Sequence, residues 1–259
     1  MRCRITKRSH NRVWVIVLIL AIACFVLSGA YIIVTMRSDN MDNLRSQAYS
    51  SSDSVSENTA AYVEPPVDFV KLKKINPDIY AWINIPGTVI DYPILSRADD
   101  NAYYLTLTVE NKKSAYGAIY TEDYNDMDFA DFNTVIYGHN MKNGSMFGSL
   151  KKYRNKTFFD ENREINIYMP GRIMTYRIFA AHIVDDRHIL LSYDFTNESV
   201  RKEYISDIFS NKGMSSYFDS QTEITADDRI ITLSTCTGKT EERYLVQGVL
   251  IYDSRKQTS

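Results

Sequence analysis

Cysteine is scarce in this 259-residue chain, and the three that it has lie far apart. Cys3 stands in a basic start, Cys24 inside an apolar run and Cys236 near the C-terminus. Only Cys236 belongs to the polar part of the chain, so that part cannot form an internal disulfide. The chain also lacks a Cys-x-x-Cys pair and two histidines at ligand spacing, which argues against a zinc site. Cys236 is therefore either an ordinary buried residue or a free thiol with a chemical use.

Excess positive charge is missing beyond the first 37 residues. Those residues hold six Lys or Arg and no acid, so all 32 acidic residues follow them, and the formal net charge of the whole chain is -2. A predominantly acidic folded part argues against nucleic acid as a partner, because phosphates attract a basic face. The 19 Tyr and 11 Phe, within a hydrophobic content of 44%, indicate a β-rich fold with a substantial core.

One long apolar run stands near the N-terminus. The run at 13–34 is long enough to cross a bilayer of about 30 Å as a helix, and the basic residues before it predict a cytoplasmic N-terminus. The run exceeds the apolar core of a typical signal peptide, although Ser28-Gly29-Ala30 leaves cleavage open. We therefore expect a basic cytoplasmic head at 1–12, a single transmembrane signal anchor at 13–35, a polar linker at 36–66 and an extracellular folded domain at 67–259.

Short β-type stretches dominate the part of the chain after Pro65-Pro66. We expect helices at 41–48, 67–75, 145–153 and 195–209. Alternating or continuous apolar residues between turn signals predict strands at 80–85, 89–95, 118–120, 134–137, 165–169, 174–181, 230–236 and 243–252. About eight short strands with few helices predict a closed or nearly closed barrel.

A thiol and a guanidinium are expected at the facing ends of two neighbouring strands. Cys236 ends the strand at 230–236, and Arg243 begins the next strand after a short polar loop. A thiol nucleophile works as the thiolate and needs a proton donor for the leaving group. His139 follows the strand at 134–137 and is the candidate partner. We interpret His182, within a strand, as structural, and His188 as part of a solvated loop.

Three segments in chain order resemble the motifs of the sortases, and of class B in particular. The segment 232–236 followed by Arg243 resembles the active-site signature, the segment 137–141 the His motif and the segment 80–94 the opening strands. The likeness covers roughly 69–252. The helix expected at 195–209 and the helical segment before the barrel suggest class B. The loop between Cys236 and Arg243 looks short for that class, which leaves the shape of the pocket open.

The resemblance implies a mainly β fold: an eight-stranded sortase-type barrel with an N-terminal helix and a helix in the loop before the Cys-bearing strand. It implies that Cys236 is the nucleophile and forms a thioacyl enzyme. His139 would be the general acid and then the base, and Arg243 would stabilise the oxyanion or hold the substrate. Ser234 is a further candidate for a hydrogen bond to substrate, or else a strand residue that faces solvent. No metal or organic cofactor is needed for this chemistry.

The resemblance also implies a membrane-anchored cysteine transpeptidase of a Gram-positive bacterium. It would cleave the C-terminal sorting signal of secreted surface proteins after Thr and transfer them to an amine of a lipid-linked peptidoglycan precursor. The signal would be read mainly by the strand and loop after Ala180 and by the helix at 195–209. Polymerisation of pilins and plain peptide hydrolysis share the acyl-enzyme and stay open. A non-enzymatic surface barrel with an incidental Cys236 is the alternative from another class.

Overall fold

The computed structural model describes residues 18–19, 21–26, 41–49, 64–211, 213 and 215–257. The chain divides into two compact units, 1–46 and 47–259. Within the described ranges no helix is long and apolar enough to cross a membrane. The predicted head at 1–12 and much of the anchor at 13–35 and the linker at 36–66 lie outside them. The single transmembrane helix therefore stays a prediction.

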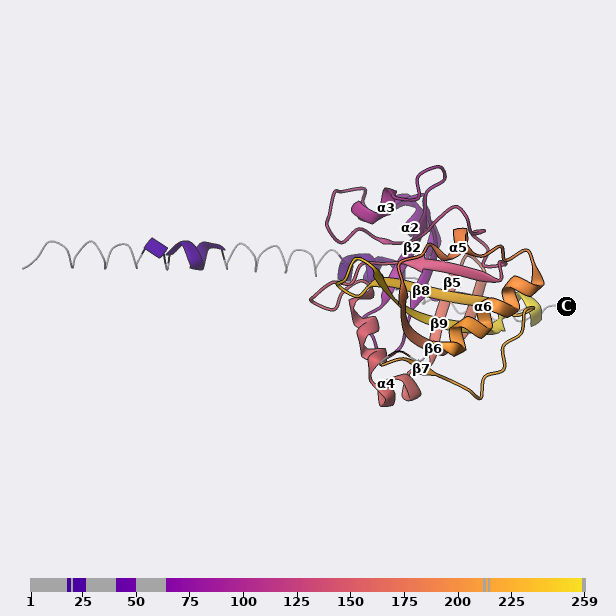
Figure 1. Ribbon diagram of the computed structural model, residues 1–259. Helices are drawn as coiled ribbons and strands as arrows, with labels where there is room; N and C mark the ends of the chain where they lie inside the picture. The colour runs from indigo at the N-terminus through magenta and orange to yellow at the C-terminus, as the bar shows by residue number, and fades with distance from the viewer. Residues whose placement is uncertain are drawn as a thin grey trace, which may run out of the picture. The chain divides into compact units, whose positions relative to one another are not determined.

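Eight strands close into a barrel, as predicted (Figure 1). Their order is β5-β1-β2-β3-β4-β8-β9-β6, and β6 pairs back onto β5; the short β7 adds to the outer edge of β6. The β2–β3 and β4–β8 pairs are parallel and the others antiparallel. The strands are β1 Ile79–Asn84, β2 Asp91–Ser96, β3 Ile119–Thr121, β4 Asn133–Tyr137, β5 Glu164–Met169, β6 Arg172–Asp185, β7 Tyr217–Phe218, β8 Ile230–Cys236 and β9 Glu242–Asp253.

Short helices surround the barrel. They are α2 Phe69–Ile75, α3 Tyr103–Thr106, η1 Phe147–Arg154, α4 Lys156–Glu161, α5 Ile189–Ser192, α6 Glu198–Ser210 and η2 Ser254–Gln257. Residues 41–49 are also helical, as expected for 41–48. The helix predicted at 145–153 is instead the 3-10 segment η1. Glycine is needed at position 148 of this segment, because a Cβ there would lie 2.3 Å from the carbonyl oxygen of Met141.

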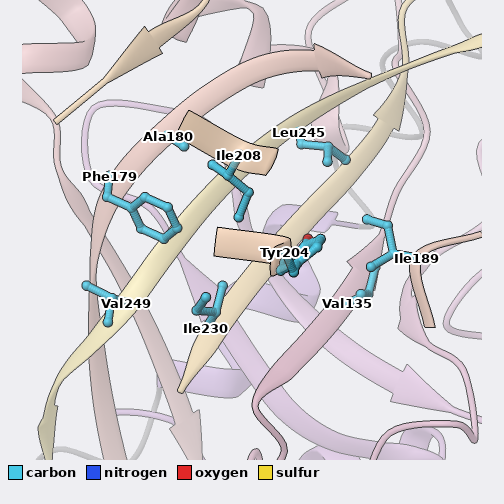
Figure 2. Packing of buried hydrophobic residues seen from close by; sticks show 9 residues of the cluster. All are labelled: Val135, Phe179, Ala180, Ile189, Tyr204, Ile208, Ile230, Leu245 and Val249. Carbon is cyan, nitrogen blue, oxygen red and sulfur yellow. The ribbon is translucent and has the colours of Figure 1, made fainter. Parts of the chain in front are cut away.

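The helix α6 covers one outer face of the barrel. Tyr204 and Ile208 are its buried side chains, and they pack onto apolar residues of β4, β6, β8 and β9 (Figure 2). This covering explains why β8 is buried along its whole length until Cys236: one face points into the barrel and the other lies under the helix. Burial of each such side chain stabilises the fold by roughly 1.5–3 kcal/mol.

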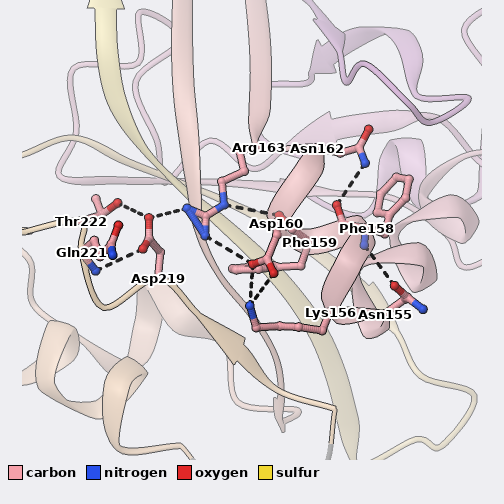
Figure 3. Close-up of polar contacts among 10 residues, drawn as sticks. All are labelled: Asn155, Lys156, Phe158, Phe159, Asp160, Asn162, Arg163, Asp219, Gln221 and Thr222. Atoms are coloured by element: carbon pink, nitrogen blue, oxygen red, sulfur yellow. Dashed lines mark hydrogen bonds and ion pairs between the residues drawn. The ribbon is translucent and has the colours of Figure 1, made fainter.

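A polar cluster fastens the chain where it returns from α6 to the barrel (Figure 3). Arg163, just before β5, forms an ion pair with Asp219, which directly follows β7. Asp219 also accepts hydrogen bonds from the Thr222 hydroxyl at 2.6 Å and the Gln221 amide at 3.1 Å. The long segment between β7 and β8 is therefore held against α4 and β5.

Candidate active site

The strand pairing brings the predicted catalytic residues to one edge of the barrel. Because β4 and β8 are parallel, their C-terminal ends meet, and Tyr137 stands opposite Ser234. His139 lies two residues beyond Tyr137, and Cys236 lies two residues beyond Ser234. The antiparallel strand β9 begins at this edge and places Arg243 directly opposite Cys236.

All four predicted site residues line one cavity of about 230 Å³. Cys236 is exposed at its mouth, and Ser234 is only 6% exposed. The alternative that Ser234 faces solvent is therefore wrong, because its strand is covered on both faces. The remaining lining residues are Leu105, Tyr120, Tyr137, Gly138, Val184, Asp186, Arg187, His188, Ile189, Thr235 and Leu245.

Three hydrogen bonds join the end of β8 to the loop that carries His139. The Gly138 amide donates to the Ser234 carbonyl at 3.2 Å, and the Thr235 hydroxyl donates to the Gly138 carbonyl at 2.6 Å. The third runs from Asn140 Nδ2 to the carbonyl oxygen of Cys236 at 2.7 Å. One backbone and two side-chain hydrogen bonds thus hold the segment 234–236 against the segment 138–140.

Glycine is required at position 138 by close packing. A Cβ on Gly138 would lie 2.5 Å from Cδ1 of Ile119 and 2.8 Å from the Phe147 ring. Contacts this short would force Ile119, Phe147 or the backbone at position 138 to move. Gly138 therefore permits the close approach that the hydrogen bonds to Ser234 and Thr235 depend on.

The carbonyl of Leu105 orients the ring of His139. His139 Nε2 lies 2.7 Å from this oxygen, and because a carbonyl can only accept, Nε2 carries the proton. In the neutral ring the lone pair is then on Nδ1, which is the atom left to take up a proton. This contact was not foreseen, because a backbone carbonyl more than thirty residues upstream carries no sequence signal.

Arg243 is fixed at one end of its guanidinium. Nη1 donates to the carbonyls of Thr240 at 2.9 Å and Glu242 at 3.0 Å. These bonds hold the guanidinium against the turn that precedes Arg243. Arg243 also lines the cavity together with Cys236. A guanidinium suits this position, because it presents five N–H donors in fixed directions and stays charged.

The other two histidines of the folded domain, His182 and His188, differ in their surroundings. His182 is buried, as a structural histidine should be: Nε2 bonds Gln247 Oε1 at 2.8 Å, and Nδ1 accepts from Asn211 at 3.0 Å. Burial lowers its pKa, although the hydrogen bond with Gln247 acts in the opposite direction. His188 follows exposed residues of a loop, as interpreted, but it also lines the cavity and bonds Glu122, which the sequence did not indicate.

A second cavity, of about 310 Å³, lies beside the first. Its walls come from α6 and β6, and both cavities share Val184, Arg187, Ile189 and Leu245. The strand and loop after Ala180 thus line the cavity that holds Cys236, and the helix α6 lines the adjoining one; their role in reading the substrate stays a prediction.

Comparison with known proteins decides the family, since a sortase domain model matches residues 83–251. The chain belongs to the sortase family. It is 36% identical to sortase B of Listeria monocytogenes over 183 residues, or 70% of this chain and 72% of that protein. It is 26% identical to sortase B of Staphylococcus aureus over 245 residues, or 93% and 98%. The crystal structure of Clostridium perfringens sortase B is 30% identical with a TM-score of 0.64, covering 71% of this chain and all of that one.

These relatives confirm the prediction of a class B sortase, which is a cysteine transpeptidase. The roles assigned to Cys236, His139, Arg243 and Ser234 stay predictions, although the fold gathers all four in one cavity.

Proposed function

We propose that this sortase cleaves a C-terminal sorting signal after Thr and transfers the new acyl group to an amine of a peptidoglycan precursor. The observation that carries the proposal is that Cys236, His139 and Arg243 line one cavity. A sortase B of Staphylococcus aureus, 28% identical with a TM-score of 0.64, has been solved as a substrate complex. A sortase B 26% identical, with a TM-score of 0.71, has been solved with triglycine, a peptide that offers a terminal amine.

In the first half-reaction Cys236 acts as the thiolate, its proton having moved to His139. Sγ attacks the carbonyl carbon of Thr, and Arg243 donates hydrogen bonds to the oxygen that becomes negative. The peptide C–N bond then breaks, and His139 returns the proton to the leaving amine. Because Nε2 of His139 is bonded to Leu105, Nδ1 is the atom that carries this proton. A thioester between Sγ and the substrate acyl group results.

In the second half-reaction an amine replaces the thiolate. The acceptor nitrogen attacks the thioester carbon, His139 takes one of its protons, and the C–S bond breaks to release Cys236. A water molecule that attacks instead yields hydrolysis. Transpeptidation therefore requires that the acceptor amine reach the thioester before water does.

The proposal includes a location. Residues 13–35 would anchor the chain in the membrane, 36–66 would act as the tether, and the catalytic domain at 67–259 would work outside the cell. The apolar run and the basic residues before it support this arrangement. Polymerisation of pilins is the second candidate, because a class B sortase of Streptococcus pyogenes involved in pilus biogenesis is 30% identical with a TM-score of 0.61.

Intact-mass measurement tests the function. The full chain in detergent micelles is incubated with a library of fluorogenic peptides that contain Thr, with and without triglycine, beside Cys236→Ala. An adduct on the wild type alone, and a ligated product when triglycine is present, is the expected result. Cleavage with no ligation to triglycine or to a lysine-bearing pilin peptide would point to a peptidase. Absence of any adduct would count against the proposal.

A further inference from the structure

A second imidazole lines the catalytic cavity. His188 lies in the segment between β6 and α5, and its Nε2 is 2.6 Å from Oε2 of Glu122. The Glu122 side chain is 13% exposed and that of His188 is 31% exposed, so water screens this contact only in part. Nε2 donates to the carboxylate whether the ring is neutral or charged. The contact therefore holds in either protonation state of His188.

The ring of His188 is held from several sides. Tyr124 meets it edge-on with ring centroids 5.5 Å apart, and Tyr137 lies at 6.4 Å. Its Nδ1 is buried and has no hydrogen-bond partner among the described residues. The contacts with Glu122 and the two tyrosines therefore hold the ring in place although one of its nitrogens lacks a partner.

Glu122 connects two walls of the cavity. It follows β3 directly, and it also acts on Tyr137, the last residue of the strand that leads to His139. Burial raises the pKa of the Tyr137 hydroxyl, and the charge and hydrogen bond of Glu122 raise it further. One carboxylate thus interacts with both Tyr137, at the end of β4, and His188, in the segment before α5.

The segment that His188 belongs to forms a wall of both cavities. Val184, Arg187 and Ile189 line the catalytic cavity and the groove beside α6. Several side-chain hydrogen bonds are described for residues 186–189. Among them, only the bond between His188 and Glu122 reaches a residue next to β3. Arg187 bonds Asp185 and Tyr193 and so holds the segment only to its own neighbours.

We propose that Glu122 and His188 form a positioning pair that sets the width of the peptide-binding cleft by fastening the 186–189 wall to β3. The inference rests on the proposed function, since a peptide must occupy this cleft. Loss of the pair lets the wall move outward, which weakens peptide binding and leaves the chemistry at Cys236 unchanged. The pair acts through the wall and takes no part in proton transfer.

Kinetics of a double-mutant cycle in the full chain test the pair. Glu122→Ala and His188→Ala should each raise KM about tenfold for a fluorogenic Thr peptide that the wild type cleaves, with kcat within about twofold. The double variant should match the single variants, because either change removes the whole contact. Glu122→Gln should keep nearly the wild-type KM, since its amide oxygen still accepts from Nε2. Asp126→Ala, which removes a carboxylate of the same loop with an exposed side chain, is the matched control.

A second readout needs no peptide turnover. We would compare the rates at which iodoacetamide and the bulkier fluorescein maleimide label Cys236. The ratio of the fluorescein maleimide rate to the iodoacetamide rate should rise several-fold in both alanine variants. In Asp126→Ala this ratio should stay at its wild-type value. A fall in kcat at constant KM, a double variant in which the two KM increases multiply, or an unchanged labelling ratio would overturn the pair. If no peptide is cleaved, the proposed function fails, while the labelling ratio still decides whether the wall is fastened.

Discussion

At the scale of single residues, we expect position 243 to require the geometry of a guanidinium as well as its positive charge. Its Nη1 is occupied by the carbonyls of Thr240 and Glu242, so only a group with further donors can also serve the cavity. Arg243→Lys should slow formation of the acyl-enzyme about 100-fold, the scale seen on loss of one oxyanion donor, because an ammonium cannot reproduce the planar fork. Rapid-quench mass spectrometry measures the rate.

The matched control for Arg243 is Lys239→Ala. Lys239 lies in the same turn, is exposed and pairs with Glu242 at 2.8 Å. Its loss should change the acylation rate less than twofold, since an exposed ion pair is screened by water and contributes little. Wild-type acylation by Arg243→Lys would show that position 243 supplies only charge.

Asn140 is the second residue whose role can be tested singly. Its Nδ2 donates to the carbonyl of Cys236 and so holds the peptide plane that follows this residue. Asn140→Asp keeps the shape but removes the donor and places a negative charge against that carbonyl. We expect kcat to fall about tenfold at pH 7 with little change in KM, since one hydrogen bond to the peptide group of Cys236 contributes about 0.5–1.5 kcal/mol.

Asn143→Ala controls for disturbance of the same loop. The Asn143 side chain accepts only from Ser145, at 3.1 Å from the amide and 2.8 Å from the hydroxyl, in the contacts described for it. If both variants lose kcat equally, general loosening of the loop explains the loss and Asn140 has no specific role.

These residues also show how far the sequence could lead. Cys236 and Arg243 could be paired because a short loop between two apolar strands places their ends together. His139 could be proposed as the partner because it follows an apolar strand. Its place in the same cavity as Cys236 could not be derived from the sequence pattern, because the parallel pairing of β4 with β8 joins segments far apart in the chain. The contact of His188 with Glu122 could not be predicted, since it depends on where a loop folds back onto β3.

At the scale of elements, α6 is held to the barrel by a connected polar network beneath its apolar contacts. Gln247 Nε2 donates to Tyr204 of the helix at 2.9 Å and to Thr232 of β8 at 3.0 Å. Gln247 Oε1 accepts from His182, whose Nδ1 in turn accepts from Asn211 at the end of α6. Protonation of Nδ1 would replace this acceptor by a second donor facing the Asn211 amide.

The network makes stability depend on pH. Burial lowers the pKa of His182 below its ordinary value of 6.5, so the unfolded chain binds the proton more readily than the folded one. As pH falls through 6.5 towards the lowered pKa, the free energy of unfolding therefore decreases, by at most about 1.4 kcal/mol per pH unit for one proton. Thermal unfolding of the wild type and His182→Gln between pH 7.5 and 5 measures this. His182→Gln should lose less stability than the wild type as the pH falls over that range. If stability depended on pH equally in both proteins, His182 would be excluded as the cause.

Elements were predicted well where their patterns were long. The eight barrel strands have continuous apolar or alternating patterns, and α6 has a helical spacing that includes Tyr204 and Ile208. The four-residue helices α3 and α5 and the two-residue β7 were missed, because such lengths carry no periodicity. Their positions are set by the barrel that they pack against.

At the scale of the whole molecule, the two ends of the barrel have different roles. The cavity lies where β4 and β8 end, whereas an ion cluster closes the end where β8 begins. There Asp253 accepts from Arg172 at 2.9 and 2.8 Å and from Arg229 at 2.8 Å. Arg172 also donates to the Asp128 carbonyl at 2.6 Å. Seven residues of β8 separate the cluster from the catalytic edge, a distance of about 20 Å.

Arg172→Ala tests whether these ends act independently. Both side chains of the Arg172–Asp253 pair are only 4% exposed, and the variant leaves a buried carboxylate with a partly exposed partner, Arg229. The free energy of unfolding in urea should fall by about 3–5 kcal/mol, whereas Lys156→Ala, at an exposed pair, should cost less than about 1 kcal/mol. The kcat of the folded Arg172→Ala enzyme should stay within twofold of the wild type, because the bonds that hold Cys236 to the His139 loop lie at the other end of β8. A kcat that falls in parallel with stability would instead mean that loss of the ion cluster at one end of the barrel disturbs Cys236 at the other end.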